Sequence, residues 1–228
     1  MSVFNNFFQL FYPKLCAICD TQLIENEKTL CTFCRHDLPL MNISNYKDNK
    51  IIKAFYGRIP IVKATSFLFY RKEGKAKTLI HQLKYKGNQK IGIFLGNWFG
   101  NLLKDSNEFS DVDYIVPVPL HPKKEKERGY NQLTTFGKKL SEILAIPYQE
   151  TILIRTTLSK TQTFKQRFER FKNTSTKFAI TDNTYFIAKH ILLIDDVITT
   201  GATLEACCNE LLKTPKVKIS IVTMAFTQ

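Results

Sequence analysis

The chain has 228 residues, 44% of them hydrophobic and 23% charged, which is enough apolar sequence for a packed core of one or two domains. We find no internal repeat or biased segment, which excludes a solenoid or a largely disordered protein. The net charge of +13 arises outside residues 1–40, which hold three basic and four acidic residues, so we expect any polyanion to meet the remainder.

The N-terminal segment has no basic residue before Lys14 and no small-residue cleavage site, so it does not resemble a secretory signal. Its apolar residues follow helical spacing instead; they are Val3, Phe4, Phe7, Phe8 and Phe11. The longest uncharged internal run, residues 91–103, is shorter than the ~20 apolar residues that cross a bilayer. We therefore expect a cytoplasmic protein without a membrane span.

Four cysteines form two C-x2-C pairs, Cys16 with Cys19 and Cys31 with Cys34, separated by 11 residues. Because structural disulfides are rare in a reducing cytosol, and because this spacing lets four thiolates converge, we predict a structural Zn²⁺ site. Simple burial of the four side chains is the alternative. We expect residues 1–40 to form this zinc-ribbon module, residues 41–58 a linker and residues 59–228 the main domain.

Within the main domain, apolar patterns alternate between strand and helix periods. Strands are predicted at residues 60–70, 112–118, 151–154, 178–180, 191–194 and 217–225. Amphipathic helices are predicted around residues 76–83, 91–102, 133–144 and 202–212. Continuous apolar strands that alternate with helices indicate an α/β fold with a parallel sheet.

Two segments are strongly basic. Residues 71–90 hold seven basic residues against Glu73, with His81 and Tyr85 available for stacking on bases, and are either a nucleic-acid contact or a lysine-rich helix surface. Residues 157–177 hold six basic residues against one acidic residue, with phenylalanines interleaved. This second segment is either a solvated helix face beside a loop or a flexible hood that closes over an anion.

The stretch ILLIDDVITTGAT, residues 191–203, combines an apolar strand, two carboxylates and a small-residue turn into a helix. Ligands of parallel sheets bind beyond the carboxyl ends of the strands, where Asp195 and Asp196 would emerge. The turn at residues 199–203 offers converging N–H groups at a helix start, which favours a phosphate. The carboxylates would repel that phosphate, so they should face sugar hydroxyls, a cation or a developing positive charge. A phosphorylated pentose satisfies these demands, whereas an ordinary threonine cap with two turn carboxylates is the alternative.

The string IDDVITTGAT closely resembles the phosphoribosyl-diphosphate (PRPP) motif of type I phosphoribosyltransferases, and together with the cysteine module it resembles the ComF family. Residues 114–132 and 160–178 resemble two further blocks of that family, through Gln162, Arg170, Asn173 and Phe178 in the second. The resemblance therefore covers nearly the whole chain, and it implies a phosphoribosyltransferase-like domain preceded by a zinc module.

The resemblance also implies roles for individual residues. Asp195 and Asp196 would bind the ribose 2′ and 3′ hydroxyls and stabilise an oxocarbenium-like centre at C1. The 5′-phosphate would be held by Thr199, Thr200, Gly201, Ala202 and Thr203. The diphosphate, with Mg²⁺ neutralising its charge, would be contacted by Val118, Pro119, Leu120 and His121. The hood that closes over it would contribute Gln162, Arg167 and Arg170.

Two functions remain open on this basis. The favoured one is an enzyme that transfers the phosphoribosyl group of PRPP to an unidentified acceptor and releases diphosphate, linked to DNA uptake in natural competence. The alternative is a non-catalytic factor that handles single-stranded DNA and keeps PRPP as a regulatory ligand or the pocket as a relic. A competence helicase or another DNA-uptake protein is the expected partner in either case.

Overall fold

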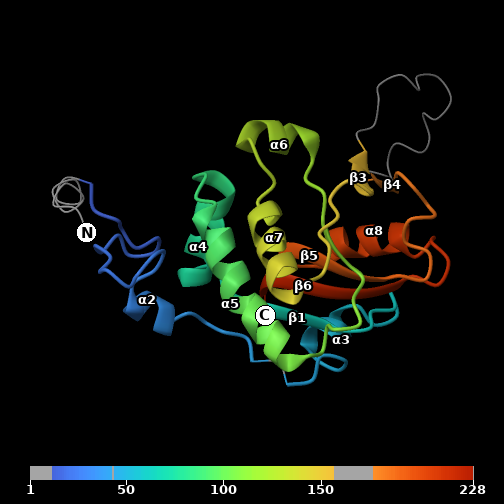
Figure 1. Cartoon of the computed structure of the whole chain (residues 1–228), viewed down its shortest axis with the longest axis horizontal. Helices are drawn as coiled ribbons and strands as arrows, with labels where there is room; N and C mark the ends of the chain where they lie inside the picture. The colour runs from blue at the N-terminus through green and yellow to red at the C-terminus, as the bar shows by residue number, and fades with distance from the viewer. Residues whose placement is uncertain (1–11, 43, 157–176, 228) are drawn as a thin grey trace.

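The computed structural model describes residues 12–42, 44–156 and 177–227. Within them, four parallel strands form one sheet in the order β1-β6-β5-β2 (Figure 1). In that order the strands are Ala64–Tyr70, Lys218–Thr227, His190–Ile198 and Tyr114–Pro117. The predicted α/β fold with a parallel sheet is therefore confirmed. Two further strands, β3 (Leu153–Thr156) and β4 (Lys177–Ile180), pair antiparallel outside this sheet.

Helices cover both faces of the sheet. The principal helices are α4 (Lys75–Tyr85), α5 (Lys90–Ser106), α7 (Leu133–Leu144) and α8 (Ala202–Leu211). Alternate residues of a strand point to opposite faces, so contacts with neighbouring residues of β5 assign each helix to a face. Ile194 lies against Gly137 of α7, whereas Asp195 interacts with Cys207 of α8. The helices α7 and α8 therefore lie on opposite faces.

Some element boundaries differ from the sequence expectations. Strand β5 continues past residue 194 to Ile198 because β6 pairs with it along this length. Strand β2 ends at Pro117, earlier than predicted, and the next helix, α6 (Pro122–Arg128), was not predicted. The sequence of α6 is almost entirely charged, so it lacks the apolar period on which helix prediction depends.

A short helix also lies in the segment predicted as a linker. This helix, α3 (Lys50–Ala54), begins at Asn49, whose side-chain oxygen accepts hydrogen bonds from the N–H groups of Ile51 and Ile52. Ile51, Ile52 and Phe55 are buried, so this part of the chain packs into the core rather than spanning solvent.

The four-cysteine module, described from residue 12 to residue 40, docks on α4 and α5 (Figure 1). It contains the short helix α2 (Thr32–His36). Gln82 of α4 donates to the carbonyl oxygen of Ala17 at 2.6 Å, and Lys75 of α4 pairs with Asp37 at 2.7 Å. The apolar residues of the module belong to the same core cluster as those of the sheet. None of the described helices has the length and hydropathy needed to span a bilayer.

Glycines on α5 set its close approach to α7. A Cβ atom on Gly96 would lie 2.9 Å from both Cβ of Lys139 and the carbonyl oxygen of Phe136, and Gly92 and Gly100 are similarly close to α7. Their spacing of four residues places them on one side of the helix. A larger side chain at these positions must push the two helices apart.

Gly96→Val is therefore expected to destabilise the protein by about 2–3 kcal/mol, because overpacking against backbone atoms cannot be relieved by a side-chain rotation. Lys104→Val, at an exposed position of the same helix, reports the helix-propensity cost of valine alone. Urea denaturation of both variants measures the difference. Equal free energies of unfolding for the two variants would contradict the close packing described here.

Candidate functional site

The candidate ligand site, hereafter the crevice, is the edge of the sheet at which the carboxyl ends of β5 and β2 lie side by side. The two strands are neighbours, and their pairing ends at Pro117 and Ile194. The chain after β2 returns through α7 on one face, and the chain after β5 returns through α8 on the other. Ligands in open α/β sheets bind at such a point, where the connections diverge to opposite faces.

Asp196 lies in this crevice and is held at both carboxylate oxygens. Lys84 Nζ lies 2.7 Å from Oδ1, and Gln132 Nε2 donates to Oδ2 at 2.6 Å. Lys84 comes from α4, and Gln132 comes directly before α7. Tyr130 links the segments that carry Lys84 and Gln132, because its hydroxyl donates a hydrogen bond to the carbonyl oxygen of Leu83. A carboxylate fixed in this way keeps a constant orientation toward the crevice.

Asp195 has a different environment from its neighbour. Its side chain is buried, and its Oδ1 accepts a hydrogen bond from the backbone N–H of Asp196 at 2.8 Å. Burial, followed by the adjacent charge of Asp196, raises the pKa of Asp195 to about 8. Consecutive strand residues point to opposite faces, so the two carboxyl groups approach a ligand from different sides of β5.

Lys84→Met is expected to destabilise the fold by about 3 kcal/mol, because it leaves the buried Asp196 carboxylate with Gln132 as its remaining side-chain partner. Lys86→Met, at the exposed end of the same helix, is the matched control and should change stability by less than about 0.5 kcal/mol. Urea denaturation at neutral pH measures both. If the Lys84→Met, Asp196→Asn double variant is destabilised by the sum of the two single effects, the interaction between Lys84 and Asp196 contributes nothing to stability.

The predicted phosphate turn follows β5 at the start of α8. The side chains of Thr199, Thr200, Ala202 and Thr203 are exposed, and Gly201 is the cap residue of the helix. The cap residue Gly201 makes no side-chain hydrogen bond, and the side-chain contact at this end of α8 is a long one, from the N–H of Ala202 to the hydroxyl oxygen of Thr200 at 3.4 Å, which a ligand could displace. The position of the first N–H groups at a helix N-terminus favours an anion.

Gly201 is required at this turn for two reasons. Its φ of 77° lies in the left-handed region, and an added Cβ would lie 2.7 Å from the ring of Phe55. Arg58 lies beside the same position, with its guanidinium 2.7 Å from the Glu205 carboxylate in the first turn of α8. The sequence prediction did not include Arg58, because a single arginine far from the motif carries no signal of this proximity.

The loop after β2 offers fewer backbone donors than the resemblance implied. The N–H of Val118 already donates to the carbonyl oxygen of Ile194 at 2.9 Å, and Pro119 has no N–H. Leu120 and His121 are half-buried beside the crevice, and the His121 side chain caps α6 by accepting from the N–H of Lys123. Of these four residues, Leu120 and His121 are therefore the ones whose backbone N–H groups could contact an anion.

The predicted hood lies outside the described residues, including Gln162, Arg167 and Arg170. Two contributors that the structure does place were missed. Lys84 was considered part of a basic surface, and Gln132 part of a family block, but neither was assigned to the carboxylates. Lys84, within a largely exposed basic run, becomes a site residue only because the packing of α4 against α5 and β1 brings its ammonium group to Asp196.

The second candidate site is the cysteine cluster. The four Sγ atoms lie within 4.8 Å of one another, and those of Cys19 and Cys31 are 3.7 Å apart. Tetrahedral coordination with Zn–S bonds of ~2.3 Å places the sulfurs ~3.8 Å apart, so this arrangement could hold such an ion. The backbone N–H groups of Cys31 and Cys34 donate to the sulfurs of Cys16 and Cys31, which stabilises thiolates.

A third polar cluster lies at the opposite end of the sheet. His190 Nδ1 is 3.1 Å from Asp111 Oδ2, and its Nε2 is 2.8 Å from Ser220 Oγ. The arrangement of Asp111, His190 and Ser220, in which the histidine lies between a carboxylate and a hydroxyl, resembles a hydrolytic triad. Ser220 is fully buried within β6, however, so no substrate reaches its hydroxyl and the cluster is structural.

Comparison with known proteins identifies homologues of this chain. It is 31% identical to Competence protein F of Haemophilus influenzae over 130 residues, which are 55% of this chain and 57% of that protein. It is 33% identical to Competence protein ComFC of Bacillus subtilis over 141 residues, or 61% of this chain and 55% of that protein. The predicted resemblance to ComF proteins is thereby confirmed.

A third relative is DNA utilization protein YhgH of Escherichia coli, with 28% identity over 138 residues, or 59% of this chain and 60% of that protein. The chain thus spans less than two thirds of the length of these relatives. No family model matches the chain.

Solved structures with a similar arrangement include phosphoribosyltransferases. A purine phosphoribosyltransferase from Pyrococcus horikoshii gives a TM-score of 0.39 at 19% identity, covering 58% of this chain and 74% of that one. An adenine phosphoribosyltransferase from Saccharomyces cerevisiae gives 0.37 at 19% identity, covering 62% and 69%. The fold described above rests on the strand order and pairing of this chain itself.

Proposed function

We propose that the protein binds PRPP in the crevice between β5 and β2 and transfers its phosphoribosyl group to an acceptor, releasing diphosphate, in connection with DNA uptake. The observation that carries the proposal is the combination of Asp195 and Asp196 on β5 with the exposed turn at residues 199–203. The nine residues 195–203 thus provide carboxyl groups that can accept hydrogen bonds from hydroxyls and N–H groups that can donate to an anion. A phosphorylated ribose requires both.

The carboxyl groups of Asp195 and Asp196 would accept the ribose 2′ and 3′ hydroxyls. Lys84 and Gln132 would act as positioning residues, because they hold both oxygens of Asp196. As the C1–O bond to the diphosphate breaks, positive charge develops at C1, and the fixed carboxylate of Asp196 would stabilise it, joined by Asp195 where it has lost its proton. The acceptor then supplies the electron pair for the new bond to C1.

The N–H groups at the start of α8 would bind the 5′-phosphate, with the hydroxyls of Thr199, Thr200 and Thr203 as further donors. Arg58 lies close enough to this turn to contribute a charge. The diphosphate would lie toward Leu120 and His121, with Mg²⁺ neutralising its charge. Gln162, Arg167 and Arg170 remain proposed contacts of the same diphosphate.

The names of the relatives, two competence proteins and a DNA utilization protein, support a role in competence and DNA utilization. A competence helicase or another DNA-uptake protein remains the proposed partner. We propose Zn²⁺ as the ion of the cysteine module, since four thiolates are the donor set of structural zinc sites. We also propose a cytoplasmic location, a reducing compartment in which cysteines are available to bind a metal rather than to form disulfides.

Thermal unfolding with PRPP and Mg²⁺ tests the proposal. At 100 times its dissociation constant a ligand stabilises by about 2.7 kcal/mol, which corresponds to a rise of roughly 5–10 °C for a chain of this size. The rise should disappear in the Asp195→Asn, Asp196→Asn double variant. No rise in the wild-type protein would refute PRPP binding.

Release of diphosphate from PRPP separates an enzyme from a binding protein. Purine bases, pyrimidine bases and ammonia are suitable first acceptors, because each presents a nitrogen nucleophile. Release that depends on one acceptor and is lost in the double variant supports transfer. A PRPP-dependent thermal shift without release for any acceptor favours the non-catalytic alternative.

Single-strand DNA binding is the second candidate, and the surface around Tyr85 favours it. This side chain is 64% exposed, and its ring contacts the guanidinium of Arg128 and the ring of His81, each at 4.9 Å. Exposed Lys86 and Lys90 lie nearby in sequence. An exposed aromatic ring among cations is a platform on which bases stack.

Binding of a labelled single strand at several salt concentrations tests this candidate. Affinity should fall steeply with salt, because phosphate contacts release counterions, and Tyr85→Ala should weaken it at every salt concentration. Ile187→Ala, at another exposed apolar residue, is the control. A flat salt response would rule out the proposed electrostatic contact.

A further inference from the structure

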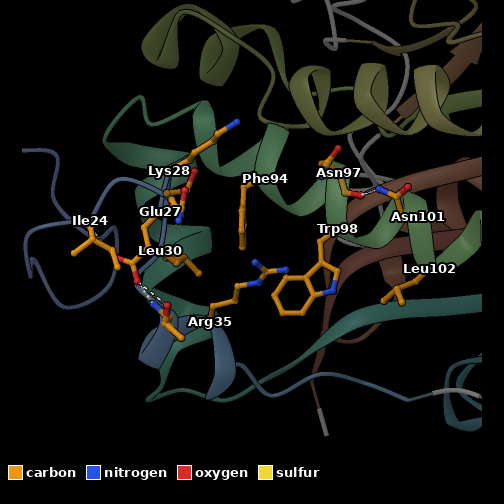
Figure 2. A pocket seen from close by; sticks show the side chains of 13 residues that line it. Ile24, Glu27, Lys28, Leu30, Arg35, Phe94, Asn97, Trp98, Asn101 and Leu102 are labelled. Carbon is orange, nitrogen blue, oxygen red and sulfur yellow. Dashed lines mark hydrogen bonds between the residues drawn. The ribbon is translucent and has the colours of Figure 1, made fainter. Parts of the chain in front are cut away.

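A pocket of ≈ 670 Å³ lies between the four-cysteine module and α5 (Figure 2). The described residues that line it include neither Asp195 nor Asp196, so it is distinct from the crevice. Its volume lies in the range of ~300–1,000 Å³ that accommodates small ligands. None of the functions considered so far uses it.

One wall of the pocket is aromatic and carries a guanidinium. Phe94 and Trp98 lie one turn apart on α5, with ring centroids 5.9 Å apart and planes at 74°. The guanidinium carbon of Arg35 lies 4.9 Å from the centroid of Trp98, and Figure 2 shows this group reaching toward the gap between the two rings. Such a wall favours a planar ligand that stacks on rings or on a guanidinium.

The charge of the lining favours an anion. Lys28 and Arg35 are exposed at the pocket, and Glu27 is the acidic residue among its described lining residues. The Glu27 carboxylate is engaged with the module itself: it accepts from the backbone N–H groups of Thr32 at 2.5 Å and Ile24 at 3.1 Å. Among the residues that the structure describes around this pocket, no competing acid is therefore turned toward the two cations.

Side-chain amides complete the lining. Asn97 and Asn101 lie one turn apart on α5, and Asn26 lies on the module. The amide of Asn101 donates to the carbonyl oxygen of Asn97 at 2.6 Å, whereas the side chains of Asn97 and Asn26 have no recorded protein partner within the described part of the chain. An amide offers both a donor and an acceptor, as the edge of a nucleobase requires.

We propose that this pocket binds a nucleotide, with its base against Phe94, Trp98 and the guanidinium of Arg35 and its phosphate toward Lys28. The base edge hydrogen-bonds with the asparagine amides. A free mononucleotide and a nucleotide within a single strand present the same chemistry, and the experiment below separates them. The proposal does not depend on PRPP binding in the crevice.

Trp98 is the one tryptophan of the chain, so its fluorescence reports directly on this pocket. Adenosine monophosphate is expected to quench the emission saturably, also with the crevice saturated by PRPP and Mg²⁺. Ribose 5-phosphate, which lacks the base, should not quench. A short deoxyadenylate oligomer that quenches when the mononucleotide does not would assign the site to single-stranded DNA.

Arg35→Met and Asn97→Ala should each lower the affinity for the quenching nucleotide by about tenfold, which is the effect expected from one lost hydrogen bond or charge contact. Lys104→Met removes a charge from the same helix outside the pocket and should have no effect. Thermal midpoints and metal content verify folding, and Asn97→Ala, at an exposed helix position, provides the test if Arg35→Met does not fold.

Three results would overturn the proposal. The first is the absence of quenching by both the mononucleotide and the oligomer. The second is quenching that Arg35→Met and Asn97→Ala leave unchanged, which would place the nucleotide elsewhere. The third is quenching by ribose 5-phosphate to the same extent as by the nucleotide, which would show that the pocket does not recognise the base.

Discussion

Asp195→Asn is expected to stabilise the protein without ligand at pH 8, by up to about 5 kcal/mol, and to remove most of its stabilisation by PRPP. The native pKa of Asp195 is raised to about 8 from an ordinary value of 3.8, first by burial and then by Asp196. Between these values the native state holds a proton that the unfolded chain releases. The protonated side chain therefore makes its full contribution to the free energy of unfolding below about pH 4. This contribution is lost as the pH rises toward 8, by up to ~1.4 kcal/mol per pH unit.

Asparagine has the same shape but no charge to bury, so the variant should lose this part of the pH dependence. Its side-chain oxygen can still accept the N–H of Asp196. PRPP binding and transfer should suffer because the amide, unlike the carboxyl group of Asp195, cannot lose a proton to offset positive charge at C1. The lower stability of the wild-type protein, compared with the variant, would then be a consequence of the function of Asp195.

Urea denaturation of both proteins between pH 4 and pH 8 measures the effect. Asp105→Asn, which neutralises an exposed acid on α5, is the control and should track the wild-type curve. Parallel curves for the wild type and Asp195→Asn would contradict the raised pKa. An unchanged thermal shift with PRPP in Asp195→Asn would contradict its place in the ligand site.

Removal of zinc by a chelator is expected to unfold the cysteine module between residues 16 and 34 while PRPP binding persists. Structural zinc sites supply ~10–16 kcal/mol of apparent binding energy at pH 7, so loss of the proposed ion removes the main constraint that holds the two cysteine pairs together. Asp196 and the phosphate turn belong to the sheet and α8, whose packing does not include the metal. The emission of Trp98 should shift to the red, because Arg35 would no longer cover its ring.

Hydrogen exchange and Trp98 emission with and without chelator test this expectation, together with the PRPP thermal shift. Cys34→Ser should reproduce the chelated state, whereas Cys208→Ala, buried on α8, should retain the metal. Gln82 joins the module to α4, the helix that also carries Lys84. Equal loss of module structure and PRPP binding would therefore show that α4 couples the two sites into one cooperative unit.

The parallel sheet could be predicted because its strands are buried on both faces and read as continuous apolar runs. Residues 191–194 are an example, since all four side chains are buried. The end of the same strand could not be predicted, because the carboxylates look like turn residues until β6 pairs beside them. Helix α6 was missed for a related reason: its start depends on capping by His121 rather than on an apolar stripe.

In the candidate site too, some residues could be predicted from the sequence and others could not. Motif chemistry identified Asp195, Asp196 and the turn at residues 199–203, because these residues are contiguous in the chain. Lys84, Gln132 and Arg58 join them only through tertiary packing, over separations of up to 147 residues. The pocket beside Trp98 was not predictable either, since it exists because the cysteine module docks on α5.

A crystal structure of the protein with PRPP and Mg²⁺ tests the central claim most directly. The account predicts the 5′-phosphate against the N–H groups at the start of α8 and the ribose hydroxyls beside Asp195 and Asp196, with Lys84 still on the carboxylate of Asp196. Electron density for PRPP at any other position, with the end of β5 left empty, would contradict it.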